Sequence, residues 1–67
     1  MVLTVNGQTR DLPDSRTTVR DLVVELGLAN TAVAVEVNKQ IVSHKLHTAT
    51  ELCDGDMVEV VTLVGGG

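Results

Sequence analysis

The stretch MVEVVTLV, residues 57–64, is the feature that most constrains the fold of this 67-residue chain. Its side chains are apolar at every position except Glu59 and Thr62. A strand of that composition is typical of the middle of a sheet, where it has a neighbour on each side. We therefore predict that residues 57–64 form a central strand and that the chain leaves the body of the domain from it.

The alternation of side chains along this strand predicts two different faces. Glu59 has to face solvent, and the two-residue period of a strand puts every second side chain on the same side. Val58 and Val60 are then expected to face the core. The exposed face consists of Met57, Glu59, Val61 and Leu63, and we expect Ala32, Ala34 and Glu36 of a neighbouring strand to extend it. The result is an apolar patch rimmed by acids, unless another loop or a second copy of the chain covers it.

The first twelve residues predict a hairpin. VLTV alternates apolar and β-branched positions, and QTRDL returns along it after Asn6 and Gly7. Asn-Gly is the pair that a type I′ turn favours. Leu3 and Val5 are expected to point inward.

One short helix is predicted after this hairpin. Thr18 is expected to cap its N-terminus, with Asp21 as a variant of the capping box, and Gly27 to end it. Apolar residues fall at helical spacing and form a single stripe: Val19, Leu22, Val23 and Leu26.

The second half of the chain predicts further strands. Residues 32–38 alternate valine with small or charged residues, which indicates a strand with one buried face. After a turn, residues 41–42 predict a short strand. Residues 43–52 show no sustained period, and we expect an irregular connection that Leu46 and Leu52 attach to the core.

Together these elements predict an α+β fold in which one main helix packs across a mixed sheet of four to five strands. The connection through the helix is expected to be a right-handed crossover. We expect one domain at residues 1–64, followed by a flexible glycine tail at residues 65–67. A frayed terminus or an expression linker would explain three glycines, but so would a carboxyl end that is itself the functional group.

The composition argues against several classes of function. A chain this short without Phe, Tyr or Trp has a small aliphatic core and little room for a deep cofactor pocket. The net charge of −4 disfavours nucleic acid and suits a protein partner with a basic face. We expect no membrane segment, and the single cysteine, Cys53, favours a reducing, cytoplasmic setting.

No group of side chains predicts a metal or catalytic site. His44, His47 and Cys53 fall short of a zinc pattern, and we expect surface histidines and a partly buried cysteine. Four carboxylates are expected to be solvated turn charges, or else an acidic collar around the base of the tail: Glu51, Asp54, Asp56 and Glu59.

Four features of the sequence together resemble one known family. They are the order of elements, the Asn-Gly hairpin, the segment VEVNKQIV, and the segment ELCDGDMVEVVTLVGGG with its Gly-Gly ending. The chain is similar in these respects to the ThiS-like sulfur carriers of thiamine biosynthesis, small β-grasp proteins with the fold of ubiquitin. The similarity covers essentially the whole chain, and the second half from Val35 to Gly67 carries most of it. A Gly-Gly ending is strong evidence when it directly follows a β-grasp last strand.

The resemblance implies a carrier and co-substrate, not an enzyme. Gly67 would be adenylated by a ThiF-like activating enzyme, related to ubiquitin-activating enzymes, that uses Mg-ATP. The resulting thiocarboxylate would give its sulfur to a ThiG-like thiazole synthase, and an enzyme such as a cysteine desulfurase would supply the sulfur. The carrier itself would bind no cofactor.

Glycine suits a tail that enters a narrow active site, because it has no Cβ and tolerates unusual φ values. We expect Gly66 and Gly67 to be the inserted pair and Gly65 to lengthen the arm. The expected partner interface consists of Met57, Glu59, Val61, Leu63 and Gly65.

Three alternatives remain open on sequence grounds. Molybdopterin-synthase sulfur carriers share the fold and the ending, although they are usually longer. A ubiquitin-like modifier would form an amide with a lysine of a target protein. A plain binding module would not need its last two glycines.

Overall fold

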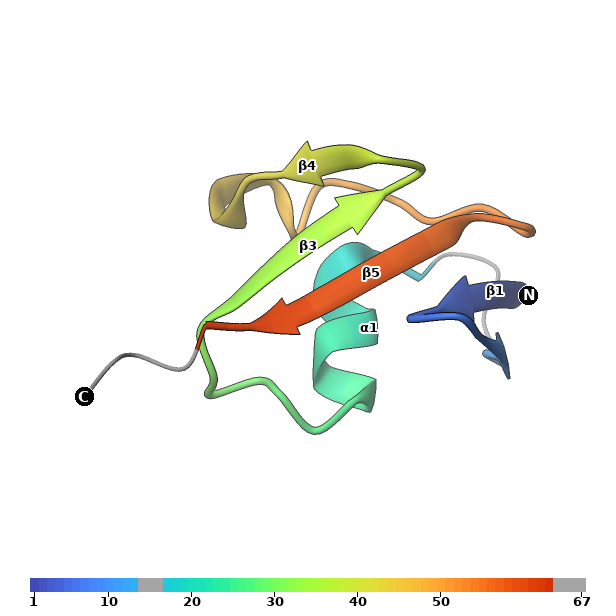
Figure 1. Ribbon diagram of the computed structural model, residues 1–67, viewed down its shortest axis with the longest axis horizontal. Helices are drawn as coiled ribbons and strands as arrows, with labels where there is room; N and C mark the ends of the chain where they lie inside the picture. Colours follow the sequence, from blue (N-terminus) through green and yellow to red (C-terminus); the bar gives the residue numbers. More distant parts are fainter. Residues whose placement is uncertain (14–16, 64–67) are drawn as a thin grey trace.

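The computed structural model describes residues 1–13 and 17–63. Five strands form one sheet in the order β2-β1-β5-β3-β4, and one α-helix crosses one side of it (Figure 1). The elements are β1 (Val2–Val5), β2 (Gln8–Asp11), α1 (Val19–Glu25), β3 (Val33–Val37), β4 (Gln40–Val42), a 3₁₀ turn η1 (His44–Leu46) and β5 (Met57–Thr62). The predicted mixed sheet with one helix, the β-grasp arrangement, is confirmed.

β5 lies in the middle of the sheet, as its apolar sequence predicts. It runs parallel to β1 and antiparallel to β3, and the other neighbouring pairs are antiparallel. The strand ends at Thr62, two residues earlier than predicted. The Leu63 N–H then donates to the Ala32 carbonyl at 2.9 Å, and Val64 lies outside the described residues.

The hairpin and the helix form for the local reasons that the sequence offers. Asn6 and Gly7 both have positive φ, +51° and +81°, as a type I′ turn requires. At the helix, the Asp21 N–H donates to Thr18 Oγ1 at 3.1 Å, and the Thr18 N–H donates to Asp21 Oδ2 at 2.9 Å. This reciprocal capping box satisfies two backbone donors at the first turn, and Gly27, at φ +77°, follows the C-terminal end.

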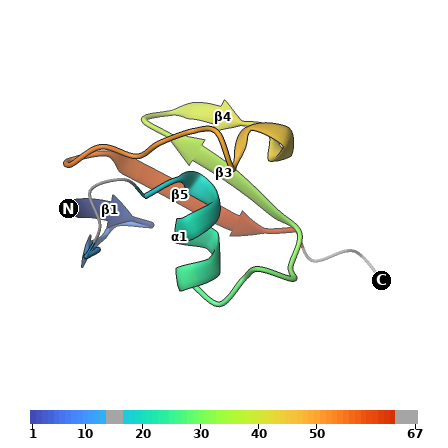
Figure 2. The same ribbon diagram turned by 180° about the vertical axis from the view of Figure 1, so that it is seen from behind.

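The core lies between α1 and one face of the sheet. Figure 2 shows the helix in front of the strands, and Figure 1 shows the other face of the sheet with no helix over it. The buried side chains come from both layers and from two loop residues: Leu3, Val5, Leu12, Val19, Leu22, Val23, Val35, Leu52, Val58 and Val60. The inward positions predicted for β1 and β5 are therefore confirmed.

The connection between β4 and β5 differs from the prediction at one of its two anchors. Leu52 is buried as expected, but Leu46 is exposed and His47 is buried instead. The η1 turn leaves Leu46 in solvent and carries the next side chain, His47, inward. His47 Nε2 lies 3.2 Å from the Val42 carbonyl, which provides the polar partner that a buried imidazole needs.

The β1–β5 pair is short and is extended by one side chain. Only Thr4 with Met57 and Val5 with Val58 are paired in register. Next along the chain, the Asn6 N–H donates to the Val58 carbonyl at 2.9 Å. The Asn6 side chain then donates to the Val60 carbonyl at 3.1 Å and accepts from the Val60 N–H at 2.9 Å. The side-chain amide of Asn6 therefore takes the place of a further backbone-to-backbone pair of hydrogen bonds between the two strands.

We predict that Asn6→Gly lowers the free energy of unfolding by about 1 to 3 kcal/mol. Glycine tolerates the positive φ of this position, so the main loss is that of two hydrogen bonds to the buried Val60. Denaturant unfolding, followed by far-ultraviolet circular dichroism, measures the change. Asn30→Gly is the control because Asn30 is exposed; an equal loss in both variants would contradict a special role for Asn6.

Candidate functional site

The face of the sheet opposite α1 carries exposed apolar side chains. Met57, Val61 and Leu63 of the β5 segment are 60%, 56% and 54% exposed, and Ile41 of β4 is 79% exposed. We call this the open face. The outward orientation predicted for Met57, Glu59, Val61 and Leu63 matches the structure. Sequence reasoning missed Ile41, which joins this face because β4 pairs it with the outward Glu36.

Two glutamates occupy the middle of the open face. Glu36 of β3 is directly opposite Glu59 of β5 in the antiparallel register. A hollow of about 310 Å³ lies beside them, and its lining includes both glutamates, Met57, Thr4 and Lys39. The open face therefore combines apolar surface with a central pair of negative charges.

A polar clasp fixes the end of β5 at which the strand begins. Asn38 Nδ2 donates to Asp56 Oδ1 at 2.9 Å, and Asn38 Oδ1 accepts from the Met57 N–H at 3.0 Å. Asp56 Oδ2 also accepts from the Cys53 N–H at 2.7 Å. Asn38 and the adjacent Lys39 both have positive φ, +50° and +71°. The clasp holds the β3–β4 turn against the start of β5. In the sequence, the Asn-Lys pair indicates the turn but not its contacts with Asp56 and Met57.

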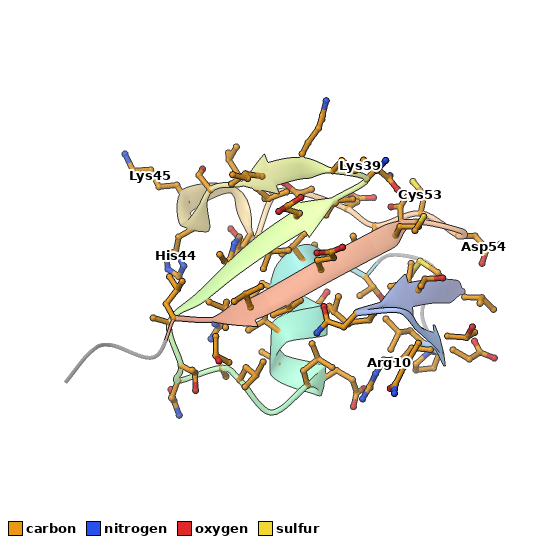
Figure 3. The ribbon with its side chains drawn as sticks, viewed as in Figure 1. Arg10, Lys39, His44, Lys45, Cys53 and Asp54 are labelled. Atoms are coloured by element: carbon orange, nitrogen blue, oxygen red, sulfur yellow. The ribbon has the colours of Figure 1, made fainter. Side chains whose placement is uncertain are left out.

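The alternative interpretation of the four carboxylates, an acidic collar around the base of the tail, does not hold for Asp54 and Asp56. Asp54 lies at the end of the molecule away from the C-terminal end of β5 (Figure 3), and it accepts from the Val2 N–H. Asp56 belongs to the clasp at the same end. Both carboxylates precede β5 whereas the tail follows it, so a strand of six residues, about 20 Å long, separates them.

The histidines and the cysteine do not form one cluster. His44 lies near the C-terminal end of β5 and Cys53 near its start, at opposite ends of the molecule (Figure 3). The His44 and His47 rings are 5.2 Å apart in an edge-on arrangement. Two expectations about these residues are wrong, because His47 is buried and Cys53 is exposed. Within residues 1–13 and 17–63, no group of His, Cys, Asp or Glu is arranged to hold a metal ion.

The tail residues of the predicted site, Gly65, Gly66 and Gly67, lie outside the described residues. The last described residue, Leu63, follows the end of the central strand and is hydrogen-bonded to the segment that precedes β3. None of the helices in the described part of the chain is long and apolar enough to cross a membrane.

Comparison with known sequences gives a consistent result. A model of the ThiS family matches residues 3–67. The sulfur carrier protein ThiS of Bacillus subtilis (strain 168) is 38% identical over 66 residues, which cover 98% of this chain and 100% of that protein. Thiazole synthases of Paramagnetospirillum magneticum and Magnetococcus marinus are 40% and 39% identical over 67 residues. In both cases the match covers all of this chain and 20% of the enzyme.

Comparison with solved structures points to the same family as the sequence comparison. The crystal structure of the thiamine biosynthesis protein ThiS from Geobacter metallireducens has a TM-score of 0.85 and 35% identity, with complete coverage of both chains. An NMR solution structure of a thiamine biosynthesis protein from the same organism has a TM-score of 0.80 and covers 88% of that chain. Since sequence and fold match over essentially the whole length, the chain belongs to the ThiS family and is a sulfur carrier protein of thiamine biosynthesis rather than an enzyme.

Proposed function

We propose that the carboxylate of Gly67 is the group that carries the sulfur. The observation that carries this proposal is the match to a sulfur carrier over nearly the full length of both chains. The three glycines after the last strand support it, because they leave the end of the chain free of side chains. The four residues beyond Leu63 can reach at most about 14 Å when fully extended, which suits insertion into a partner.

The chemistry needs activation because an oxide ion is a poor leaving group. A carboxylate oxygen of Gly67 attacks the α-phosphorus of ATP in the activating enzyme, and pyrophosphate leaves. A sulfide ion then adds to the carbonyl carbon of the acyl adenylate, and AMP leaves with its electron pair. Where the donor is instead an enzyme persulfide, its outer sulfur adds in the same way, and a thiol then reduces the acyl disulfide that forms and is itself oxidised to a disulfide. The product is a thiocarboxylate, which provides the nucleophilic sulfur for the thiazole. Mg-ATP is bound by the partner in this scheme, and the carrier holds no cofactor.

Three partners follow from this scheme. A thiazole synthase takes the sulfur, and the two thiazole synthases that match this chain over a fifth of their length support that partnership. The resemblance to sulfur carriers adds a ThiF-like adenylating enzyme and a sulfur-donating enzyme such as a cysteine desulfurase. We place these steps in the cytoplasm, a reducing compartment that suits the free, exposed thiol of Cys53.

We further propose that the open face and the tail are used together. Met57, Val61 and Leu63 present apolar surface next to Glu59, and only Val64 separates Leu63 from the glycine tail in the sequence. A partner that covers this face can receive the tail in an adjacent active site. Gly65 then spans the space between the docking face and the inserted pair, Gly66 and Gly67.

The proposed role of the terminus predicts a change of mass. After incubation with the activating enzyme of the same source, Mg-ATP and sulfide, the intact chain should gain the mass difference between sulfur and oxygen. A variant that lacks Gly66 and Gly67 should gain nothing, because its carboxylate no longer reaches the adenylation site. Intact-protein mass spectrometry makes the measurement. No gain in the intact chain, with an enzyme shown to be active on another carrier, would refute the terminal thiocarboxylate.

The proposed role of the open face predicts a loss of affinity when a charge is placed on it. Val61→Lys should leave the fold intact, because Val61 is exposed, and should weaken capture by the activating enzyme about tenfold or more. Val24→Lys is the matched control, since Val24 is half exposed on α1, on the other side of the sheet. Surface plasmon resonance with immobilised enzyme compares the two. Equal affinity of both variants would remove the open face from the interface.

A further inference from the structure

The glutamate pair at the centre of the open face is an unfavourable arrangement for the isolated chain. Glu36 and Glu59 are directly opposite in the β3–β5 register, and like charges at such positions destabilise a sheet. Cross-strand neighbours of this kind have Cβ atoms about 5 Å apart. Ile41, on the other side of Glu36, is apolar and cannot offset the repulsion.

Among the described residues, neither glutamate forms an ion pair with a neighbouring cation. Lys39 lines the same hollow as both glutamates, yet in the described part of the chain the one ion pair joins the Met1 ammonium to Asp11. Lys39 has a positive φ, in the turn that the clasp holds beside β5. The two carboxylates are therefore available to an external group.

A second copy of the chain is a poor occupant of this face. Symmetric pairing would place the same patch of both copies face to face. The four carboxylates of the two copies would then share one apolar interface, where like charges disfavour association. The apolar side chains favour docking, whereas the charge pair rejects a partner that does not carry positive charge.

We propose that the open face docks a protein partner that inserts one arginine or lysine side chain between Glu36 and Glu59. The partner's surrounding surface is apolar and covers Ile41, Met57 and Val61. The hollow of about 310 Å³ beside the two glutamates gives a long cationic side chain room to enter. A guanidinium can donate to both carboxylates at once, which removes their mutual repulsion in the complex. This inference rests on the proposed function, since it takes the activating enzyme as the partner.

The test measures adenylation of the intact carrier at several salt concentrations. The variants are Glu36→Gln, Glu59→Gln and the double variant, with Glu25→Gln as the control because Glu25 is exposed on α1. Release of pyrophosphate by the activating enzyme gives KM and kcat. We expect the double variant to raise KM about tenfold or more, with kcat retained at saturation. We also expect a weaker salt dependence of kcat/KM, because the opposite charges no longer meet.

Thermal unfolding shows that the variants are folded, and their Tm should be no lower than that of the unaltered chain because a repulsion has been removed. A KM and a salt dependence equal to those of Glu25→Gln would overturn the inference.

Two further measurements distinguish a failure of the docking inference from a failure of the proposed sulfur-carrier function. If the unaltered chain gains no sulfur by mass, the proposed function itself fails. If it gains sulfur while all variants share one KM, only the docking inference fails. Sedimentation equilibrium of the unaltered chain should give a monomer, and a dimer that Val61→Lys disperses would assign the open face to a second copy instead.

Discussion

The structure depends on β5 having a hydrogen-bonded neighbour on each side. Without it, the order β2-β1-β5-β3-β4 divides into two separate hairpins that share no rung. β5 also contributes Val58 and Val60 to the core, which matters in a chain without aromatic side chains. Its two ends are fixed differently: the Asn38–Asp56 clasp holds the start, while the C-terminal end leads to Leu63 and the tail.

Short-range patterns were sufficient to predict the strands, the α-helix and the inward faces of β1 and β5, but not the η1 turn or the burial of His47. The Asn-Gly turn, the Thr18 cap and the alternation along β5 each involve residues within a few positions of one another. The role of Asn6 depends on Val60, 54 residues away, and that of Asn38 depends on Asp56. A short polar side chain gives no sign in the sequence of which distant backbone it will meet.

In the candidate site, too, short-range features could be predicted from the sequence and long-range contacts could not. The exposed face of β5 follows from its own period, but the opposition of Glu36 and Glu59 requires the β3–β5 register, which the sequence does not contain. The alternative of an acidic collar fails because Asp54 and Asp56 lie before β5 and the tail lies after it, so a full strand separates residues that are close in the sequence. The proposed chemistry of Gly67 rests on family membership and on the residues of the tail, since the described chain ends at Leu63.

The parallel pairing of β1 with β5 also determines how the carrier resists force. A pull between Met1 and Leu63 acts along the two strands in opposite directions and shears them past each other. The bonds from Thr4 to Asp56, from Asn6 to Val58 and from Asn6 to Val60 then stretch together instead of breaking one after another. This geometry loads the β1–β5 bonds as a group, whereas the edge strands β2 and β4 are each hydrogen-bonded to one neighbour only.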